Sequence, residues 1–588
     1  MRNREGCMRG VGSHDTLILV HYKNWAQPLD LHFKEQGNPR ARVALSSAMA
    51  PPSAIEVLPE SDTSTFTIPD RLTIQHVAKR RAASGKLVAG VAAAADVGSF
   101  KGRTHHSHKA LAKRWDHRLT DETKTRGGSS LKEAAKFLKI PGLISLGGGL
   151  PSSEYFPVDE MTFKVPRVGT AGELNGNRET IVAGKHDMAN GSSDYDLATA
   201  LQYGQGHGSA QLLRWMIEHT ELVHNPPYQD WSCTMTVGST SAFDMALRML
   251  SRPGDWVLSE EYTFPAMTET AAPMGVRVAA VRMDEDGMLA ESLDEVLCQW
   301  DEKARGGRKP FLLYTVPTGQ NPTGSTQSLQ RRKAIYAVAQ KHDLFILEDE
   351  PYYFLQMQPY TGPNAPDVPP PASHQEFLAS LVPSYLSLDT DGRVMRMDSF
   401  SKVIAPGTRV GWITASEQIC KRYSVHADLS TQSPSGVSQM MLFKLLEEHW
   451  GHAGYLDWLV HIRMAYTARR NVMLEACEQY LPREVVSWKP PVAGMFQWLH
   501  VDWTKHPDYP TKTLEGIEDE LFHENMRSGT LLMKGSWFCP DKDVDTGRMF
   551  FRATYCAAPS EQIREAVRRF GEALRSSFRL PAASNGHA

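Results

Sequence analysis

Short β-rich runs alternate with helical patterns between about residues 205 and 415, and this alternation constrains the fold of the 588-residue chain more than any other feature. The β-rich runs cover residues 233–237, 311–316, 344–347, 394–397 and 410–414. Strands that alternate with helices are covered on both faces, which is typical of a mostly parallel sheet. The sequence therefore predicts an α/β fold for this region.

A glycine and several hydroxyl residues, beginning Gly238-Ser239-Thr240, join the first of these runs to a predicted helix. The helix is indicated by apolar residues at the i, i+3, i+4 and i+7 spacing, namely Phe243, Ala246, Leu247 and Leu250. Free backbone N–H groups and the helix dipole make such a helix start a binding site for an anion. An ordinary N-cap is the alternative interpretation.

Three acidic residues, Glu348, Asp349 and Glu350, follow directly after the run 344–347. Open α/β sheets bind ligands at the carboxyl ends of their strands, so these acids are candidates for a site. Acids at a strand end can also be solvated loop residues, and the pattern alone leaves both interpretations open.

Lys402 lies in a segment that also contains Ser399, Ser401 and Arg409. A lysine that can attack a carbonyl, two hydroxyls and a cation are the groups needed to hold a phosphorylated aldehyde such as pyridoxal phosphate. That cofactor also needs a carboxylate at its ring nitrogen, a helix N-terminus at its phosphate and an aromatic side chain against its ring. The chain offers each of these, whereas Lys402 taken alone could be a solvated surface lysine.

Charge and cysteine content limit the class of protein. Residues 1–130 carry 20 Lys and Arg against 12 Asp and Glu, so the remaining residues carry 44 against 55 and the net charge is −3. The seven cysteines form no C-x-x-C pair, which favours a reducing compartment and argues against structural zinc, and we expect no metal. No apolar run is long enough to span a bilayer. We expect a soluble cytoplasmic enzyme, with a mitochondrial location left open.

Two stretches before the α/β region carry weaker signals. Residues 143–146 predict a short strand that ends in three glycines, Gly147 to Gly149, where the backbone can approach a ligand closely or simply turn. Residues 164–192 are predicted to be a polar insertion.

Nine short motifs occur in one order along the chain. They are Ser-Leu-Gly-Gly-Gly-Leu-Pro (145–151), Gln-Tyr-Gly (202–204), Val-Gly-Ser-Thr (237–240), Asn-Pro-Thr-Gly (321–324), Glu-Asp-Glu-Pro-Tyr-Tyr (348–353), Ser-Phe-Ser-Lys (399–402), Pro-Gly-x-Arg (406–409), Gly-Met-Phe-x-Trp (494–498) and Phe-Arg-Ala (551–553). Over residues 130–578 the set resembles class I pyridoxal-phosphate aminotransferases. The branch it resembles most holds the fungal aromatic aminotransferases and the kynurenine/2-aminoadipate aminotransferases.

The resemblance implies a fold type I transferase, with a mostly parallel seven-stranded sheet in a large domain and a smaller α/β domain. It divides the chain into a basic, partly disordered extension (1–125), an N-terminal part of the small domain with an arm (126–200), a large cofactor-binding domain (201–430) and a C-terminal small domain (431–588). Within the extension, residues 72–83 are expected to form one helix that packs on the body.

The resemblance also assigns roles to catalytic residues. Lys402 would form the Schiff base with the cofactor and move the proton of the substrate Cα. Asp349 would pair with the pyridinium nitrogen. Tyr352 and Asn321 would hydrogen-bond the ring oxygen O3′.

Binding roles follow in the same way. The phosphate would lie among Ser239, Thr240, Ser399, Ser401 and Arg409, and Tyr203 would reach the phosphate of the neighbouring subunit in a homodimer with shared active sites. Phe264 would stack on the ring, with Tyr262 as the alternative. Arg552 would bind the substrate α-carboxylate in a bidentate fork, helped by Asn321, and Gly149 would allow the close approach of the strand edge.

The implied function is transfer of the amino group of phenylalanine, tyrosine or tryptophan to a 2-oxo acid such as 2-oxoglutarate, by a ping-pong mechanism. Transamination of 2-aminoadipate or kynurenine is an alternative within the same class. A regulator in which the basic N-terminal region binds DNA is an alternative from another class, although that region shows no helix-turn-helix pattern. We therefore expect small-molecule substrates as partners, and neither nucleic acid nor membrane.

Overall fold

The computed structural model describes residues 72–84, 97–102, 106–134, 142–169, 172–363, 368–541 and 546–581, with a few single residues between these ranges. Most of the basic extension, including both Met1 and Met49, lies outside the described residues. No helix in the described part of the chain is both long enough and apolar enough to cross a bilayer.

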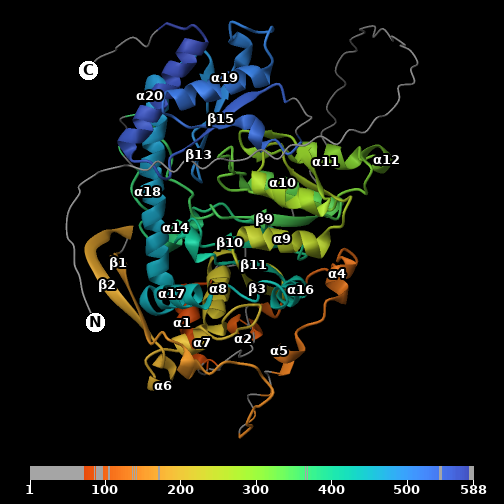
Figure 1. Ribbon diagram of the computed structural model, residues 1–588, viewed down its shortest axis with the longest axis vertical. Coiled ribbons are helices and arrows are strands. Elements are labelled where there is room, and N and C mark those ends of the chain that lie inside the picture. The colour runs from red at the N-terminus through yellow and green to blue at the C-terminus, as the bar shows by residue number, and fades with distance from the viewer. Residues whose placement is uncertain are drawn as a thin grey trace, which may run out of the picture. The chain divides into compact units, whose positions relative to one another are not determined.

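A seven-stranded sheet forms the centre of the fold (Figure 1). Its strands, in spatial order, are β3 (Trp231–Thr236), β11 (Gly411–Ser416), β10 (Val394–Ser399), β9 (Phe345–Asp349), β8 (Leu312–Thr315), β4 (Trp256–Glu260) and β5 (Arg277–Val281). All neighbouring strands are parallel except that β11 is antiparallel to both β3 and β10. This large sheet confirms the predicted α/β fold.

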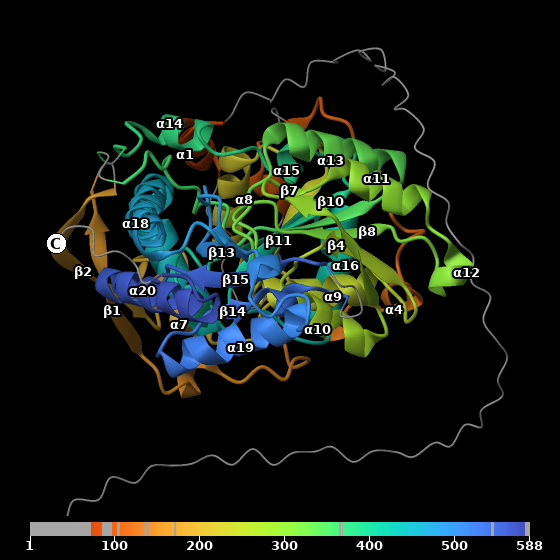
Figure 2. The same cartoon turned by 90° about the horizontal axis from the view of Figure 1, so that it is seen from above.

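Helices cover both faces of the large sheet. They are α8 (Ala210–Val223), α9 (Ser239–Leu250), α10 (Pro265–Ala271), α11 (Ala290–Cys298), α13 (Leu329–Lys341), α15 (Tyr385–Leu388) and α16 (Glu417–Asp428). Figure 2 shows α11 and α13 on one side of the sheet and α9 and α10 on the other. The apolar positions predicted for α9, Phe243, Ala246, Leu247 and Leu250, are all buried.

All five predicted strands are present, but β4 and β5 were missed. Their sequences, Trp-Val-Leu-Ser-Glu and Arg-Val-Ala-Ala-Val, contain few β-branched residues, and their pairing with β8 and with each other makes them strands. The strand predicted at residues 143–146 is wrong. These residues are irregular and exposed, with Ile144 87% and Leu146 96% accessible to solvent.

A smaller antiparallel sheet lies next to the large one. Its strands are β12 (Val486–Ser487), β13 (Phe496–Val501), β15 (Met549–Thr554) and β14 (Met533–Lys534), in that order. The helices packed around it are α18 (Gly451–Tyr480), α19 (Leu514–Arg527) and α20 (Ser560–Ser577). Ile563, Val567, Phe570 and Leu574 of α20 are buried, because they form one apolar face of the helix.

The predicted polar insertion folds largely as a β-hairpin, β1 (Glu160–Val168) with β2 (Leu174–Gly184). Val165 and Ile181 form a small apolar cluster with Leu445, which belongs to the π-helical turn Lys444–His449. Three buried apolar side chains, Val165, Ile181 and Ala183, are few for strands of nine and eleven residues, which is why the hairpin is hard to recognise from its sequence.

The helix expected at residues 72–83 is present as α1 (Ile74–Ala83) and packs on α8 through ion pairs. Arg81 binds the buried Glu218 and also Glu447, and Arg80 binds the buried Glu221. His106 contacts the same Glu221 at 2.8 Å. Further along, Trp115 is fully buried and donates a hydrogen bond to the Gly392 carbonyl. The described residues of this region are therefore integrated with the body.

Candidate active site

A cavity of about 420 Å³ lies at the carboxyl ends of β9 and β10, between the large and the small sheet. Eleven of the residues predicted for the site line it: Ser239, Thr240, Phe264, Asn321, Asp349, Tyr352, Ser399, Ser401, Lys402, Arg409 and Arg552. They come from positions up to 313 residues apart in the sequence. The fold therefore gathers most of the predicted site into one place.

Asp349, the last residue of β9, lies at the floor of this cavity. Its Oδ2 accepts a hydrogen bond of 2.7 Å from the Tyr314 hydroxyl, while its buried Oδ1 has no hydrogen-bond partner among the described residues. Burial raises the pKa of Asp349 to about 6, although the Tyr314 hydrogen bond opposes the shift. An unpaired carboxylate oxygen that faces a cavity is suited to a cationic N–H group.

Glu348 and Glu350, the neighbours of Asp349, are also buried, so the alternative of solvated loop acids is wrong. The buried Arg396 compensates these charges. Its guanidinium makes two 2.8 Å hydrogen bonds to Asp398 and lies 3.3 Å from Glu348. Burial raises the pKa of Glu350, and Arg396 opposes that shift. The floor of the cavity is thus held by charges that are paired inside the protein.

The end of the cavity near α9 offers groups that are suited to an anion. Ser239 begins α9, and its buried hydroxyl has no hydrogen-bond partner among the described residues. Arg409, at a φ of +49°, donates to the Ser401 hydroxyl at 3.4 Å and to the Pro406 carbonyl at 3.0 Å. Gly238 has a φ of +83°, and a Cβ there would collide with the Arg409 guanidinium. Glycine is therefore required for the arginine to reach the helix start.

Lys402 lies three residues after the end of β10 and hydrogen-bonds to none of the described residues. Two hydrogen bonds between Ser399 and Ser401 fix the turn that carries it. Ser399 donates its hydroxyl proton to the Ser401 hydroxyl at 2.8 Å, and the Ser401 N–H donates back to Ser399 at 3.1 Å. The lysine is thus an amine on a rigid turn at the wall of the cavity.

Arg552 projects from β15 in the small sheet. Its Nη1 donates to the Asn321 amide oxygen at 2.7 Å, and its guanidinium lies 4.7 Å from the ring centres of both Phe496 and Phe538. Its buried Nε has no hydrogen-bond partner, and no described carboxylate forms an ion pair with it. Burial lowers the pKa of Arg552. A half-buried cation without a counter-ion is suited to an incoming carboxylate.

The two candidates for the stacking ring lie in different places. Phe264 lines the cavity, whereas Tyr262 packs edge-on against Trp498 and Phe550 outside it. Tyr352 is buried at the cavity wall, and burial raises the pKa of its hydroxyl.

Gly149 and Tyr203 do not line the cavity of this chain. Tyr203 is 61% exposed and lines a separate, smaller pocket, and Gly149 lies in an exposed segment with open space around it. Apolar side chains in the same segment are exposed, among them Leu143, Ile144, Leu146 and Tyr155.

Sequence reasoning missed several residues of the cavity: Phe243, Tyr314, Met495, Phe496, Thr554 and Cys556. The period of two in a strand could have found part of this set. Thr554 lies two residues after Arg552 on the same strand, and Phe496 is paired with Thr554 across β13 and β15, so all three side chains share one face. Tyr314 gave no such signal, because a tyrosine in a buried strand is normally part of the core.

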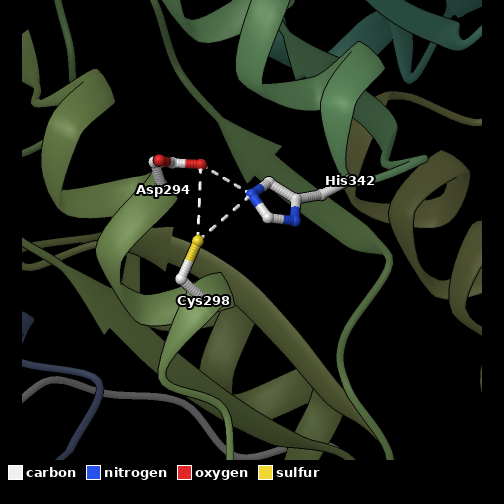
Figure 3. Close-up of side chains that lie close together, drawn as sticks. All are labelled: Asp294, Cys298 and His342. Carbon is white, nitrogen blue, oxygen red and sulfur yellow. Dashed lines mark hydrogen bonds and ion pairs between the residues drawn. The ribbon is translucent and has the colours of Figure 1, made fainter.

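Away from this cavity, the described residues contain one group of His, Cys and Asp side chains close enough to share a metal ion (Figure 3). Asp294 and Cys298 of α11 face His342, which follows α13, and the His342 Nε2 lies 2.6 Å from Asp294. Lys341 donates to both Asp294 oxygens, and the Lys309 ammonium lies 3.0 Å from the His342 Nδ1. Donation by Lys309 leaves the proton on Nε2, so that nitrogen has no lone pair for a metal. We attribute the group to ion pairing between α11 and α13.

Comparison with known proteins identifies the class. The family model for aminotransferase class I and II matches residues 179–570, and the chain therefore belongs to this family. An aromatic amino acid aminotransferase of Schizosaccharomyces pombe is 45% identical over 476 residues, which are 80% of this chain and 99% of the relative. The aminotransferase swnA of Arthroderma benhamiae is 41% identical over 82% of this chain and 95% of its own length.

A solved structure agrees with both relatives. The crystal structure of the aminotransferase Aro8 from Candida albicans superposes with a TM-score of 0.76 at 42% identity, and the match covers 80% of this chain and all of that one. The fold is thus that of the fold type I aminotransferases.

The family uses pyridoxal 5′-phosphate, and the residues of the cavity fit this cofactor. The unpaired Asp349 oxygen matches a protonated ring nitrogen, and the unpaired Ser239 hydroxyl, the start of α9 and Arg409 match a phosphate. Lys402 supplies the amine that an aldehyde requires.

Proposed function

We propose that this enzyme transfers the amino group of phenylalanine, tyrosine or tryptophan to a 2-oxo acid such as 2-oxoglutarate, in a ping-pong reaction. The observation that carries the proposal is that Lys402, Asp349 and Arg552 line one cavity. The amine, the carboxylate and the unpaired cation are the three groups that this chemistry needs. The aromatic specificity named for the 45% identical relative supports the choice of substrate.

Each residue has a task that follows from its position. When bound, pyridoxal phosphate supplies an electron-withdrawing ring that accepts the electron pair released from the substrate Cα–H bond. Asp349 would keep the ring nitrogen protonated, and Tyr352 and Asn321 would hydrogen-bond the ring oxygen. Ser239, Thr240, Ser399, Ser401 and Arg409 would bind the phosphate. Lys402 would hold the aldehyde at rest and then move the proton at Cα.

Substrate binding would depend on Arg552 and on the apolar wall. The Arg552 guanidinium would take the α-carboxylate in two parallel hydrogen bonds. Phe264 would stack on the cofactor ring, and Met495 and Phe496, at the start of β13, would be part of the apolar lining available to a substrate side chain. This lining supports an aromatic amino acid.

We also propose a homodimer in which Tyr203 reaches the phosphate in the partner's cavity and Gly149 approaches the substrate. The exposure of Tyr203 and of the apolar side chains around residues 143–155 supports a second copy as the cover of this surface. Light scattering should give twice the chain mass of 65.6 kDa. Tyr203→Phe should weaken cofactor binding without changing that mass.

We also propose the domain boundaries of the chain and its location in the cell. The strands of the large sheet lie between residues 231 and 416 and those of the small sheet between 486 and 554, which supports domains at 201–430 and 431–588, with residues 126–200 added to the latter. The described cysteines Cys233, Cys298, Cys420, Cys477 and Cys556 are free thiols, which supports a cytoplasmic location. Cell fractionation tests the location.

The test of the reaction is a comparison of kcat/KM for phenylalanine, 2-aminoadipate and kynurenine with 2-oxoglutarate as acceptor. We expect phenylalanine to be preferred. A preference for 2-aminoadipate or kynurenine would keep the aminotransferase but replace its substrate, and no transfer from any of the three would overturn the proposal.

A further inference from the structure

A further cavity, about 430 Å³ in volume, lies where the small sheet meets the edge of the large sheet, and it is as large as the catalytic cavity. We call it the seam cavity. Its lining comes from the large-sheet side, with the short hairpin β6 (Met283–Asp284) and β7 (Gly287–Met288), and from β12, β13 and β15 of the small sheet. The lining residues used below are Tyr262, Glu285, Ser487, Trp488, Lys489, Trp498, His500, Arg548 and Phe550. None of them has a role in the reaction proposed above.

Aromatic rings form one wall of the seam cavity. Trp498 and Phe550 stack with ring centres 4.9 Å apart and an angle of 15° between their planes. Tyr262 meets both edge-on, at 5.4 and 5.3 Å. Trp488 adds a further half-buried ring to the lining. A preformed aromatic surface of this kind favours a flat, aromatic ligand.

Charges of both signs lie on the other walls. Arg548 donates from Nη2 to Glu261, and Lys489 donates to Asp286, so each cation uses only part of its N–H donors in the contact that holds it. Their side chains are 41% and 43% exposed and remain accessible to a ligand. The exposed Glu285, next in sequence to Asp286, can accept hydrogen bonds from an ammonium group. Rings, cations and a carboxylate together match an amino acid with an aromatic side chain.

One face of the small sheet connects the two cavities. Phe496, Arg552 and Thr554 line the catalytic cavity, and the next residues of the same face, His500 and Phe550, line the seam cavity. Trp498, paired directly with Arg552, also faces the seam cavity. On the large-sheet side, Tyr262 lines the seam cavity and Phe264, two residues later, lines the catalytic cavity. A ligand in the seam cavity would therefore touch residues directly beside those that hold the substrate carboxylate.

We propose that the seam cavity binds a second aromatic amino acid, which does not react there and whose carboxylate is held by Arg548 and Lys489. The ring would lie against Trp498 and Phe550, and the ammonium group would face Glu285. The assignment rests on the lining of the seam cavity and does not depend on which amino acid reacts at Lys402.

Equilibrium dialysis of the holoenzyme with L-tryptophan tests the proposal. The enzyme is first treated with borohydride, which reduces the bond between Lys402 and the cofactor, so that the amino acid binds but is not consumed. We expect two tryptophan molecules per chain in the wild type. Ser487→Trp fills the seam cavity from an exposed position and should leave one, whereas Ser487→Ala should leave two. Arg552→Leu should also leave one, because it removes the catalytic site and spares the seam cavity.

The pattern across variants separates the seam site from the proposed reaction. If the wild type binds one tryptophan that Ser487→Trp removes and Arg552→Leu keeps, the seam site stands and the aromatic substrate does not. If Ser487→Trp still binds two tryptophan molecules, the seam site is overturned. It is also overturned if the wild type binds a single tryptophan that Arg552→Leu removes and Ser487→Trp does not. Should Ser487→Trp fail to fold, Lys489→Ala decides, because it should weaken the tryptophan binding that Arg552→Leu keeps by about 10-fold through loss of one charged hydrogen bond. Unchanged binding in Lys489→Ala would equally overturn the assignment.

Discussion

The two walls of the catalytic cavity differ in whether their charged side chains form ion pairs inside the protein. On the large-sheet wall, the acids Glu348 and Asp398 are paired inside the protein with the buried Arg396, and among these acids only Asp349 has an oxygen that faces the cavity. On the small-sheet wall, Arg552 is held by an amide oxygen and two aromatic rings, and no described carboxylate forms an ion pair with it.

This difference matches the two kinds of ligand. A resident cofactor is bound through many turnovers, and a paired, rigid floor keeps its position fixed. A substrate enters and leaves in each half-reaction, so the cation that receives it must be left without a permanent counter-ion. The large-sheet wall is therefore suited to holding the cofactor, and the small-sheet wall is suited to recognising the substrate carboxylate. Substitutions on each wall should separate these two functions.

Replacing Lys402 should have the largest effect. Lys402→Ala removes the group that moves the proton at Cα, and we expect transfer from phenylalanine to 2-oxoglutarate to fall by about 10⁴-fold. Cofactor should still bind, because the phosphate site and Asp349 remain. Lys421→Ala, at an exposed position of α16, is the matched control and should retain full activity. Amino transfer that persists in Lys402→Ala would disprove the assignment.

Asp349→Asn tests the charge on the large-sheet wall with little change in shape. An amide cannot keep the ring nitrogen protonated, so kcat should fall by about 10²- to 10³-fold. Asp349→Glu restores the charge and should recover part of the loss. Stopped-flow measurement of the half-reaction with phenylalanine reports this step directly. Equal losses in the two variants would show that shape, and not charge, matters here.

Arg552→Lys tests recognition on the small-sheet wall. Lysine keeps the charge but cannot form two parallel hydrogen bonds, and we expect kcat/KM for phenylalanine to fall by about 50-fold, mostly through KM. Cofactor affinity should not change. The control substrate is 2-phenylethylamine, which lacks the carboxylate, and its slow turnover should be the same in both enzymes. A similar loss with this amine would mean that Arg552 supports the cavity and does not recognise the carboxylate.

Much of the fold could be predicted because its strands are short, buried and β-rich, and because turn residues separate them from amphipathic helices. The failures have physical causes. β4 and β5 become strands through their neighbours, and the hairpin of β1 and β2 buries few side chains. Residues 143–146 are apolar but exposed in the single chain, so the rule that apolar residues lie inside gave a strand that does not form.

The lining of the catalytic cavity could be predicted where a motif is suited to one chemical group, as with Lys402, Asp349 and Arg409. Residues that act through another side chain leave no such pattern. Tyr314 is the clearest case, since its role depends on the parallel pairing of β8 with β9, which places Tyr314 next to Leu347 in register and its hydroxyl on Asp349. Gly149 and Tyr203 remain predictions, because their proposed roles depend on a second copy of the chain.

Tyr314→Phe should have the smallest effect on cofactor binding. It sharpens the comparison of the two walls most, since it removes one hydrogen bond from the large-sheet wall and leaves every charge of the cavity in place. Cofactor affinity of the apoprotein should fall by about 5-fold at pH 8, as expected for one hydrogen bond. The pKa of Asp349 is already raised by burial to about 6, so wild-type affinity should be lost as the pH falls through that value and the carboxylate becomes neutral. Loss of the Tyr314 donor raises this pKa further, and the midpoint should move to higher pH. Tyr336→Phe is the matched control, because Tyr336 donates a comparable buried hydrogen bond to Asp389 away from the cavity. The pH midpoint for loss of cofactor affinity should not move in Tyr336→Phe. If it moves equally in both variants, the effect is one of general stability, and cofactor binding by the large-sheet wall does not depend on Tyr314.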